Sequence, residues 1–300
     1  MKVQHLKYAL EVARLGSISK AADSLLFSQP NISSALKTLE AELGFSIFYR
    51  TNKGVAVTPK GELFLSSARK IVAEYDNIAS ISEGKKHYRF HLSSGYHFAA
   101  EDAFARFCAE FPTDTVLSFS LINTSFDQII DNVYQNKSDL GVIVVPDFSQ
   151  DSFSSMCEKK SLRATKIRTL SNFLYLREGH PLLDESPFDF AKLREFPFID
   201  YPLNVISVGA EPIMPDIFDQ NNRILVDDRN TRYRIVSLSN AFTIGCGLHR
   251  TMCERHHLRA IELADIVFVM YAVQRQDRDI TSEIKRYLQL LKSECANITV

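Results

Sequence analysis

The sequence lacks any long apolar run that could cross a membrane. Within its 300 residues, no stretch approaches the roughly 18 consecutive apolar residues that a membrane span requires. The amino-terminal segment does not resemble an export signal, because Lys7, Glu11 and Arg14 interrupt its apolar positions. These two absences predict a cytoplasmic protein with no membrane partner.

Cysteine is scarce, and the motifs of common enzymes are missing. The five cysteines form no Cys-x-x-Cys pair, which argues against a disulfide framework and favours a reducing compartment. No Gly-x-Ser-x-Gly, Gly-x-Gly-x-x-Gly, Walker loop or His-Glu-x-x-His occurs. We therefore expect a protein that is not an enzyme and that needs no cofactor or metal.

One cluster keeps a metal-binding or redox alternative open. His249, Cys253 and His256 are spaced by four and three residues, so they would share one face of a helix. Their charged neighbours Arg250 and Glu254 are equally typical of an ordinary solvent-exposed helix. The spacing fits both a metal or redox site and an ordinary solvent-exposed helix.

Charge is divided unevenly along the chain, although the net charge is only −1. The first 87 residues carry 12 Lys and Arg against 8 Asp and Glu, whereas the remainder carries 23 against 28. A basic head on an acidic body is typical of a DNA-binding module fused to a module of another kind. The length of 300 residues also favours two or three packed units.

Two helices are predicted at the amino terminus. The first carries apolar residues at Val3, Leu6 and Leu10, spaced by three and four positions, and Gly16 ends it. Ser19 is expected to cap the second helix, which is short. A pair of alanines at positions 21 and 22 would let another helix approach closely.

A third helix is predicted to begin at Ser28–Pro30, where serine can cap and proline fits the first turn. Its apolar residues Ile32, Leu36 and Leu39 recur every four or three positions, and Gly44 closes it. The buried face of this helix is therefore predicted to lie against the first two helices.

Short polar side chains and one cation cover the opposite face of the third helix. They are Gln29, Asn31, Ser33, Ser34 and Lys37. Such groups reach base edges and phosphates, and two helices joined by a short turn, the second polar outward, make a helix-turn-helix. The alternative is a three-helix domain whose polar face only meets solvent.

A hairpin is predicted after the third helix. Two β-prone runs, 45–50 and 55–57, flank a turn that contains Asn52 and Gly54. Arg50 and Lys53 at the tip of this hairpin would meet the DNA backbone beside the groove. The hairpin would be the wing of a winged helix-turn-helix.

Residues 21–61 resemble the DNA-binding signature of LysR-type transcription regulators. The match keeps its spacing and comprises Ala21-Ala22, Leu25, Ser28-Gln29-Pro30, Ile32-Ser33, Leu36, Leu39-Glu40, Leu43-Gly44, Phe48, Arg50 and Thr58-Pro59-Lys60-Gly61. The resemblance implies a third helix in the major groove of double-stranded DNA, with the wing on the backbone. The predicted DNA-binding residues are Gln29, Pro30, Asn31, Ser33, Ser34, Lys37, Arg50 and Lys53.

A long connecting helix is predicted from Pro59 to residue 84, with Thr58 as its cap. Two apolar stripes run along this helix. The first is Phe64, Ala68, Ile71, Tyr75 and Ile78, and the second is Leu65, Val72 and Ala79. Because a small winged domain cannot bury both stripes, we expect a partner helix and hence a homodimer. A helix packed wholly within its own chain is the alternative.

The family resemblance implies the same dimerisation. Tetramers are common in that family, and RNA polymerase is an expected partner.

The remaining two hundred residues alternate strands and helices, which predicts an α/β fold with a parallel sheet. Strands are expected at 89–93, 116–121, 140–145, 170–176, 197–199, 224–226, 242–244 and 267–273, and helices at 104–111, 126–134 and 280–291. Two α/β lobes joined by two crossing strands resemble the periplasmic-binding-protein-like effector domain of the same family. Asp139-Leu140-Gly141, His180-Pro181-Leu182 and Phe198-Ile199-Asp200-Tyr201 carry this resemblance, and the segment 239–247 departs from it.

The predicted organisation has three parts. Residues 1–58 form the winged helix-turn-helix and residues 59–87 the linker and dimerisation helix. Residues 88–300 form the effector domain, with one lobe at 88–161 plus 266–300 and a second at 162–265. A solute-binding protein for transport is the rival function, since the second part alone would allow it.

A small-molecule effector is expected outside the carboxyl ends of the strands, between the lobes. The predicted contacts are Ser93, Ser94, Thr124 and Ser125 from the first lobe and Tyr201 and Thr243 from the second. Free N–H groups and hydroxyls at two helix starts would suit an anion. Plain capping explains Thr124 and Ser125 without any ligand, because Ser125 and Gln128 also match a capping box.

Overall fold

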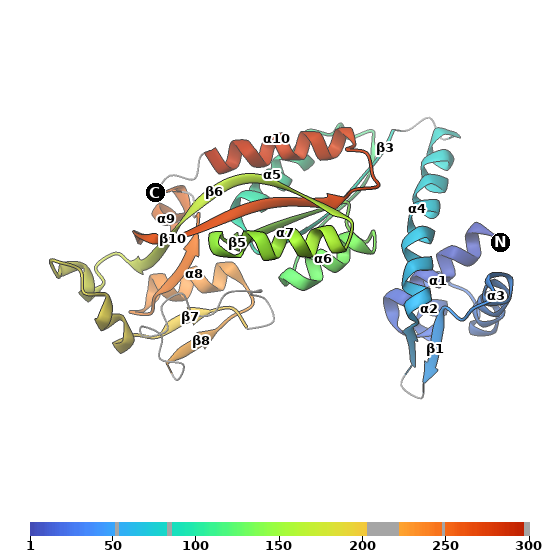
Figure 1. Ribbon diagram of the computed structural model, residues 1–300, viewed down its shortest axis with the longest axis horizontal. Coiled ribbons are helices and arrows are strands. Elements are labelled where there is room, and N and C mark those ends of the chain that lie inside the picture. The colour runs from blue at the N-terminus through green and yellow to red at the C-terminus, as the bar shows by residue number, and fades with distance from the viewer. Residues whose placement is uncertain (52–53, 83–85, 203–221, 248–249, 297–300) are drawn as a thin grey trace. The chain divides into compact units, whose positions relative to one another are not determined.

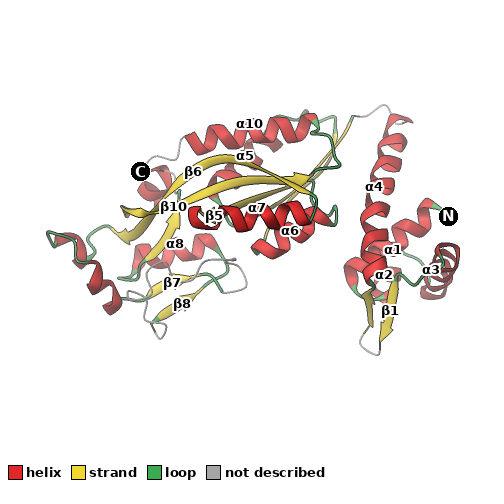
Figure 2. Cartoon of the chain, in the orientation of Figure 1, coloured by secondary structure: helices red, strands yellow, loops and turns green. Residues whose placement is uncertain are grey.

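The computed structural model describes residues 1–51, 54–82, 86–202, 222–247 and 250–296 (Figures 1 and 2). The chain divides into two compact units. The first contains residues 1–89, 112–118 and 134–138, and the second contains residues 90–111, 119–133 and 139–300. Each unit is described by itself below.

The first unit begins with three helices, a hairpin and one long helix. They are α1 (Val3–Leu15), α2 (Ile18–Leu25), α3 (Gln29–Leu43), β1 (Phe48–Thr51), β2 (Gly54–Val57) and α4 (Pro59–Ser82). Leu6, Ile32, Leu36 and Leu39 are buried in a shared core, as their spacing predicts. Ala21 and Ala22 of α2 are also buried, so the helices approach closely at this point.

The ends of these helices agree with the sequence in part. Gly16 and Gly44 end α1 and α3 with φ angles of 63° and 74°, which glycine adopts without strain. The prediction that Ser19 caps α2 is wrong, because the cap lies two residues earlier, at Ser17, whose Oγ accepts a hydrogen bond from the backbone N–H of Lys20. Ser28 precedes α3 as predicted, but its hydroxyl makes no cap hydrogen bond.

The linker helix α4 packs on the winged domain along its first half, and it meets α1 again at Asp76, whose carboxylate accepts a hydrogen bond from Lys7 Nζ at 2.8 Å. Thr58 Oγ1 accepts a hydrogen bond from the Gly61 N–H at 2.9 Å, which confirms the predicted cap. Leu65 and Ala68 are buried in the core of the three helices. The predicted first stripe then emerges, and its residues Ile71, Tyr75 and Ile78 are 42%, 49% and 61% exposed.

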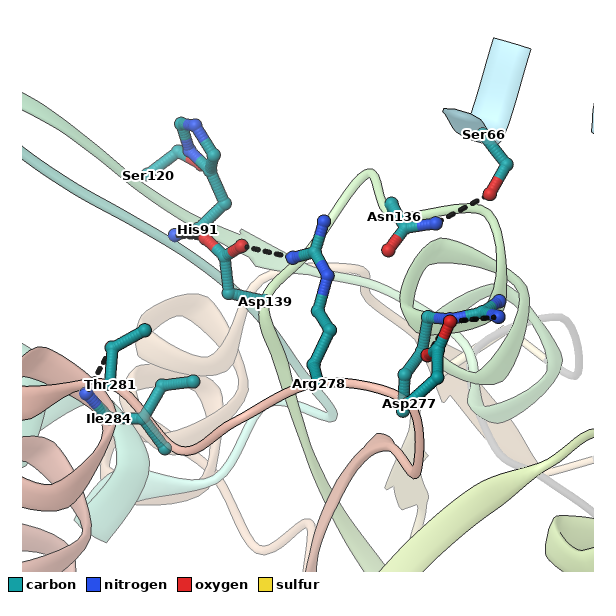
Figure 3. Close-up of polar contacts among 10 residues, drawn as sticks. Ser66, His91, Ser120, Asn136, Asp139, Asp277, Arg278, Thr281 and Ile284 are labelled. Atoms are coloured by element: carbon teal, nitrogen blue, oxygen red, sulfur yellow. Dashed lines mark hydrogen bonds and ion pairs between the residues drawn. The ribbon is translucent and has the colours of Figure 1, made fainter. Parts of the chain in front are cut away.

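A loop of five residues, 134–138, contacts α4 within the same unit. Asn136 Nδ2 donates a hydrogen bond to Ser66 Oγ (Figure 3). Arg69 Nη1 donates to the Gln135 carbonyl at 2.7 Å. These two contacts link residues 134–138 to α4, so the segment belongs to the first unit.

A six-stranded sheet forms the centre of the second unit. Its order is β4 (Val116–Asn123), β3 (His87–Ser94), β5 (Leu140–Pro146), β10 (Leu258–Arg275), β6 (Leu162–Arg177) and β9 (Thr243–Cys246). β3 and β5 are parallel, whereas β10 runs antiparallel to both β5 and β6. The predicted strands are present, but β6 and β10 are 16 and 18 residues long and extend well beyond the predicted segments.

Helices cover both faces of this sheet near β5. Because alternate side chains of a strand point to opposite faces, Leu140 and Val142 pack with α5 (Phe98–Ala109) and α10 (Ser282–Ala296). Gly141 faces α6 (Phe126–Tyr134) on the other side. Figure 1 shows α5 and α10 on one side of the long strands, and α6 and α7 (Gln150–Lys159) on the other.

A second, smaller core lies towards the other end of the two long strands. It includes β7 (Phe198–Asp200), β8 (Arg223–Leu225), α8 (Arg229–Leu238) and α9 (Arg250–His256). Tyr175 of β6 and Leu258 of β10 are buried there with Ile199 and Val236. The long strands therefore serve both cores, as the predicted pair of crossing strands requires.

Hydrogen bonds of Asp139 connect three segments around the six-stranded sheet. Its carboxylate accepts hydrogen bonds from the backbone N–H of His91 and from Arg278 Nη1, both at 2.9 Å (Figure 3). His91 Nδ1 lies 2.8 Å from Ser120 Oγ on the edge strand β4. Polar contacts thus connect β4, β3, the start of β5 and the loop before α10.

Replacement of Gly61 by alanine should destabilise the protein. A methyl group there would lie 2.2 Å from the carbonyl oxygen of Ile47, so the start of α4 would have to move. We expect Gly61→Ala to lower the free energy of unfolding by about 1–3 kcal/mol in denaturant titrations. Gly95→Ala is the matched control, since its methyl group would meet its nearest neighbour at 3.7 Å. An equal effect of the two substitutions would contradict this account.

Candidate DNA-binding and effector sites

The outward face of α3 is polar and accessible. Gln29, Pro30, Asn31, Ser34 and Lys37 are all exposed, and Ser33 is half-buried. The opposite side of the same helix is almost fully buried, so rotation of α3 about its axis would expose its apolar residues. The structure therefore brings together on one helix all six of the DNA-binding residues predicted for it.

The turn before α3 holds that helix against α2. Leu26 adopts a left-handed conformation with φ 58°, and the Phe27 N–H donates to the Ala22 carbonyl at 3.0 Å. Phe27 packs edge-on against Tyr8 of α1, with ring centroids 5.4 Å apart. The pair α2 and α3 consequently has the short, fixed turn of a helix-turn-helix.

The hairpin is attached to the end of α1. The Val55 N–H donates to the Gly16 carbonyl at 3.0 Å, and Gly54 approaches that carbonyl so closely that a methyl group would lie 2.5 Å from it. Arg50 lies in β1, opposite Val55 of β2. Lys53 lies outside the described residues, so its role and that of the Arg50 side chain stay predictions.

Two strand ends meet at the predicted effector site of the first lobe. The Thr124 N–H, just after β4, donates to the carbonyl of Ser94 at the end of β3, at 2.9 Å. Ser93 Oγ accepts a hydrogen bond from Asn132 Nδ2 at 3.0 Å, whereas no described residue makes a hydrogen bond with the buried Ser94 Oγ. The strand ends therefore place Ser94 and Thr124 side by side.

Ser125 performs the capping role that the alternative interpretation gave it. Its hydroxyl accepts a hydrogen bond from the Gln128 N–H at 3.4 Å. The Gln128 side chain does not return to Ser125, because its Nε2 donates to Asn132 Oδ1 at 2.9 Å. Only half of the predicted capping box forms.

Tyr201 of the second lobe meets the turn after β3. Its ring stacks on Tyr96, with centroids 5.1 Å apart and an interplanar angle of 29°. Tyr96 has a φ of 45°, an uncommon conformation for a residue other than glycine. Thr243 is fully buried, where its hydroxyl donates to the Ile199 carbonyl at 2.7 Å and accepts from Arg232 Nε. Both hydrogen bonds of Thr243 serve the protein itself.

Arg232 of α8 was not predicted from the sequence, where it reads as one more cation on a solvated helix. It is only 6% exposed, and its guanidinium carbon lies 4.6 Å from the centre of the Tyr201 ring. Its Nη2 donates to the Ile244 carbonyl, and no carboxylate of the described residues pairs with it. A buried guanidinium without a counter-ion is a favourable place for an anion.

His97 is the second group that the sequence did not reveal. It is 5% exposed, and neither ring nitrogen has a hydrogen-bond partner among the residues that the structure describes. Burial, and then the nearby positive charge of Arg229, lower the pKa of His97 to about 3. His97 is therefore neutral at physiological pH.

Glu101, Asn123 and Arg229 form a polar group beside His97. Arg229 Nη2 lies 2.5 Å from Glu101 Oε2, and Asn123 Nδ2 donates to Glu101 Oε1 at 3.1 Å. Burial raises the pKa of Glu101, and the contacts with Arg229 and Asn123 oppose that change. The Arg229 guanidinium also lies 4.7 Å from the centre of the Phe98 ring.

Burial disfavours the thiolate form of four of the five cysteines. Burial raises the pKa of Cys246 to about 12 and those of Cys157, Cys253 and Cys295 to about 11. These thiols are protonated at neutral pH, so little thiolate is present to react. His249 lies outside the described residues, and across the parts of the chain that are described no group of three His, Cys, Asp or Glu could hold a metal ion.

These features define a class of protein, a winged helix-turn-helix joined to a two-lobed ligand-binding domain. Residues 3–62 match the model of the bacterial regulatory helix-turn-helix protein, lysR family, and residues 90–296 match that of the LysR substrate binding domain. The chain belongs to the LysR family of DNA-binding transcription regulators, which carry an effector-binding domain.

Individual relatives agree with this membership. The uncharacterized HTH-type transcriptional regulator YwbI of Bacillus subtilis (strain 168) is 29% identical over 98% of this chain and 96% of its own length. Full-length OxyR from Pseudomonas aeruginosa shares the fold with a TM-score of 0.61 at 13% identity, and covers 100% of this chain and 96% of its own. Full-length LysG from Corynebacterium glutamicum, solved with bound effector Arg, gives 0.60 at 13% identity over 99% and 98% of the two chains. At such identities the two structures establish the fold alone.

None of the helices that the structure describes is both long enough and apolar enough to cross a bilayer.

Stability should fall as the pH drops below the ordinary pKa of histidine, in part through His97. Because the folded-state pKa of about 3 lies below the ordinary value of 6.5, the unfolded chain binds a proton in this interval that the folded chain does not. The free energy of unfolding should therefore decrease from pH 6.5 downward and be independent of His97 above it. His97→Phe should flatten this dependence in thermal unfolding measured at successive pH values. Identical slopes for both proteins would show that His97 is not buried in its neutral form.

Proposed function

We propose that this protein regulates transcription as a homo-oligomer that reads duplex DNA with α3 and responds to a small-molecule effector. The observation that carries the proposal is the one-sided burial of α3, in residues that match the family's helix-turn-helix. Binding of the effector shifts the protein between two arrangements, and the linker helix α4 transmits the change to the DNA-binding domain. The regulator acts in the cytoplasm, where it meets the chromosome and RNA polymerase, and it performs no catalysis.

The first turns of α3 supply the contacts with bases. Gln29 and Asn31 carry amides of the kind that bind adenine through two hydrogen bonds in the major groove. Ser33 and Ser34 add short donors and acceptors, and Pro30 offers an apolar surface to a thymine methyl group. Lys37, one turn further along, binds phosphate, together with Arg50 and Lys53 of the wing.

The exposed stripe of α4 supplies the contact between subunits. Ile71, Tyr75 and Ile78 are spaced by four and three residues and lie on one face of a helix. Burial of these side chains against the same stripe of a second subunit removes them from water and creates a two-fold axis. Two DNA-binding domains related in this way read two half-sites of a near-palindromic sequence.

The effector binds where the ends of β3 and β4 meet Tyr201. Ser94 and Thr124 contribute polar groups from the first lobe, and Tyr96 and Tyr201 contribute a stacked aromatic pair. Arg232, which has no counter-ion among the described residues, accommodates an anionic group of the effector. Ser93, Ser125 and Thr243 support this site through the hydrogen bonds that they already make.

Lys37→Ala should weaken DNA binding at every sequence that the protein recognises. Purified full-length protein first selects fragments from the genome of its own organism, and the affinity for a selected fragment is then measured against salt concentration. Loss of one phosphate contact should lower the affinity and reduce the slope of log affinity against log salt by about one. Lys285→Ala is the control, since Lys285 is an exposed residue of α10.

The result is decisive in both directions. Failure of the wild-type protein to retain any duplex fragment at low salt would refute the proposed function. Retention with an unchanged salt slope in Lys37→Ala would remove Lys37 from the interface and leave the function intact.

Substitution of both Ile71 and Ile78 by glutamate should separate the subunits. Both side chains are exposed in the single chain, so the fold of each subunit should survive, while two buried charges at the interface would be strongly unfavourable. We expect analytical ultracentrifugation to show half of the wild-type mass. Leu238→Glu serves as the control, because Leu238 is 76% exposed on α8, outside the proposed interface. An unchanged mass for the double variant would place the interface elsewhere.

A further inference from the structure

Five residues beside the predicted effector contacts form a group that we call the turn cluster: Ser94, His97, Glu101, Asn123 and Arg229. Its members come from the end of β3, the start of α5, the end of β4 and the start of α8. Four of them carry buried polar atoms that have no hydrogen-bond partner within the described parts of the chain, namely Ser94 Oγ, both ring nitrogens of His97, Asn123 Oδ1 and Arg229 Nη1. Buried polar groups are normally paired, so this concentration points to a ligand.

The orientation of Asn123 is fixed by Glu101. The Glu101 carboxylate can only accept hydrogen bonds, so the group that meets it at 3.1 Å must be the Asn123 NH₂. The carbonyl oxygen Oδ1 is therefore the unpaired atom of Asn123, and it requires a donor from the ligand.

His97 requires a donor and an acceptor at the same time. Its pKa is lowered to about 3, so the ring is neutral, with one N–H and one bare nitrogen. Ser94 Oγ can donate or accept. Arg229 can donate through Nη1, but its charge is already balanced by the ion pair with Glu101. The turn cluster is thus electrically neutral and offers both kinds of hydrogen bond.

We propose that the effector places an uncharged group that both donates and accepts hydrogen bonds, as a primary carboxamide or a diol does, against Ser94, His97 and Asn123. An anion fits this place poorly, because it cannot donate to Asn123 Oδ1 and would be repelled by Glu101. The inference rests on the proposed effector site and assigns its two ends different chemistry, an anionic group at Arg232 and a neutral one at the turn cluster.

Acetamide and acetate test this assignment because they have nearly the same shape and differ in charge and donor capacity. Full-length protein labelled with ¹⁵N-histidine is titrated with each compound, and the imidazole resonances of His97 are followed by long-range ¹H–¹⁵N correlation. His97→Phe identifies those resonances by their loss. We expect acetamide to shift the His97 signals saturably and acetate to leave them in place. Ethylene glycol, titrated in the same way, separates a diol from a carboxamide as the preferred group.

Two variants establish that the response comes from the turn cluster. Ser94→Ala removes one unpaired hydroxyl and should weaken the binding of acetamide several-fold, whereas Ser282→Ala, an exposed serine of α10 outside the site, should not. His97→Phe removes two unpaired nitrogens while keeping a ring, so it should raise the melting temperature in the absence of ligand and abolish stabilisation by acetamide. A residue with a purely structural role would lower the melting temperature when replaced.

The contrary outcomes are distinct from failure of the proposed function. A His97 shift with acetate equal to that with acetamide would show that the turn cluster takes anions and would overturn the inference. No shift with either acetamide or ethylene glycol would also overturn it. In both cases the proposed function is tested separately, by the response of DNA binding to the effector. If the wild-type protein shows this response and Arg232→Gln does not, the proposed regulator and its effector site remain supported.

Discussion

The arrangement of the amino-terminal unit depends on the burial of one face of α3. Ile32, Leu36 and Leu39 are removed from water against α1 and α2, and their combined apolar area makes any other rotation of the helix unfavourable. The polar face is thereby directed outward before any DNA is present. The hairpin held at Gly16 and the cap at Thr58 then place the wing and the linker helix relative to this helix.

The ligand-binding unit follows a different constraint, the continuity of β6 and β10. The two strands are paired along nearly their whole length and contribute to both hydrophobic cores. Polar residues at the strand ends of one lobe consequently meet residues that follow β7 in the other, as the stack of Tyr96 on Tyr201 shows. Several buried polar groups near this stack have no partner among the described residues, and the effector site that we propose makes use of them.

The fold is shared between family members, whereas the polar groups of the proposed effector site belong to this chain. Solved relatives share the fold at 13% identity. In the effector site that we propose, His97, Arg229 and Arg232 select the ligand groups. The chemistry of the site therefore comes from side chains rather than from the architecture that carries them.

The sequence by itself determined the features that arise from local periodicity and local backbone preference. The spacing of Ile32, Leu36 and Leu39 predicted α3 and its outward residues, and Gly16 and Gly44 marked helix ends, because glycine adopts positive φ freely. The alternation of strands and helices predicted the α/β class and the parallel pairing of β3 with β5.

Tertiary structure decided what depends on partners distant in sequence. The first half of β6 carries Arg163, Lys166 and Arg168, so it did not have the pattern of a buried strand, and only its pairing with β10 showed its length. Thr243 was predicted as an effector contact, whereas in the folded chain its hydroxyl bonds to the Ile199 carbonyl and to Arg232. His97 and Arg232 carry no local signal at all, because burial and the absence of a partner are properties of the folded chain.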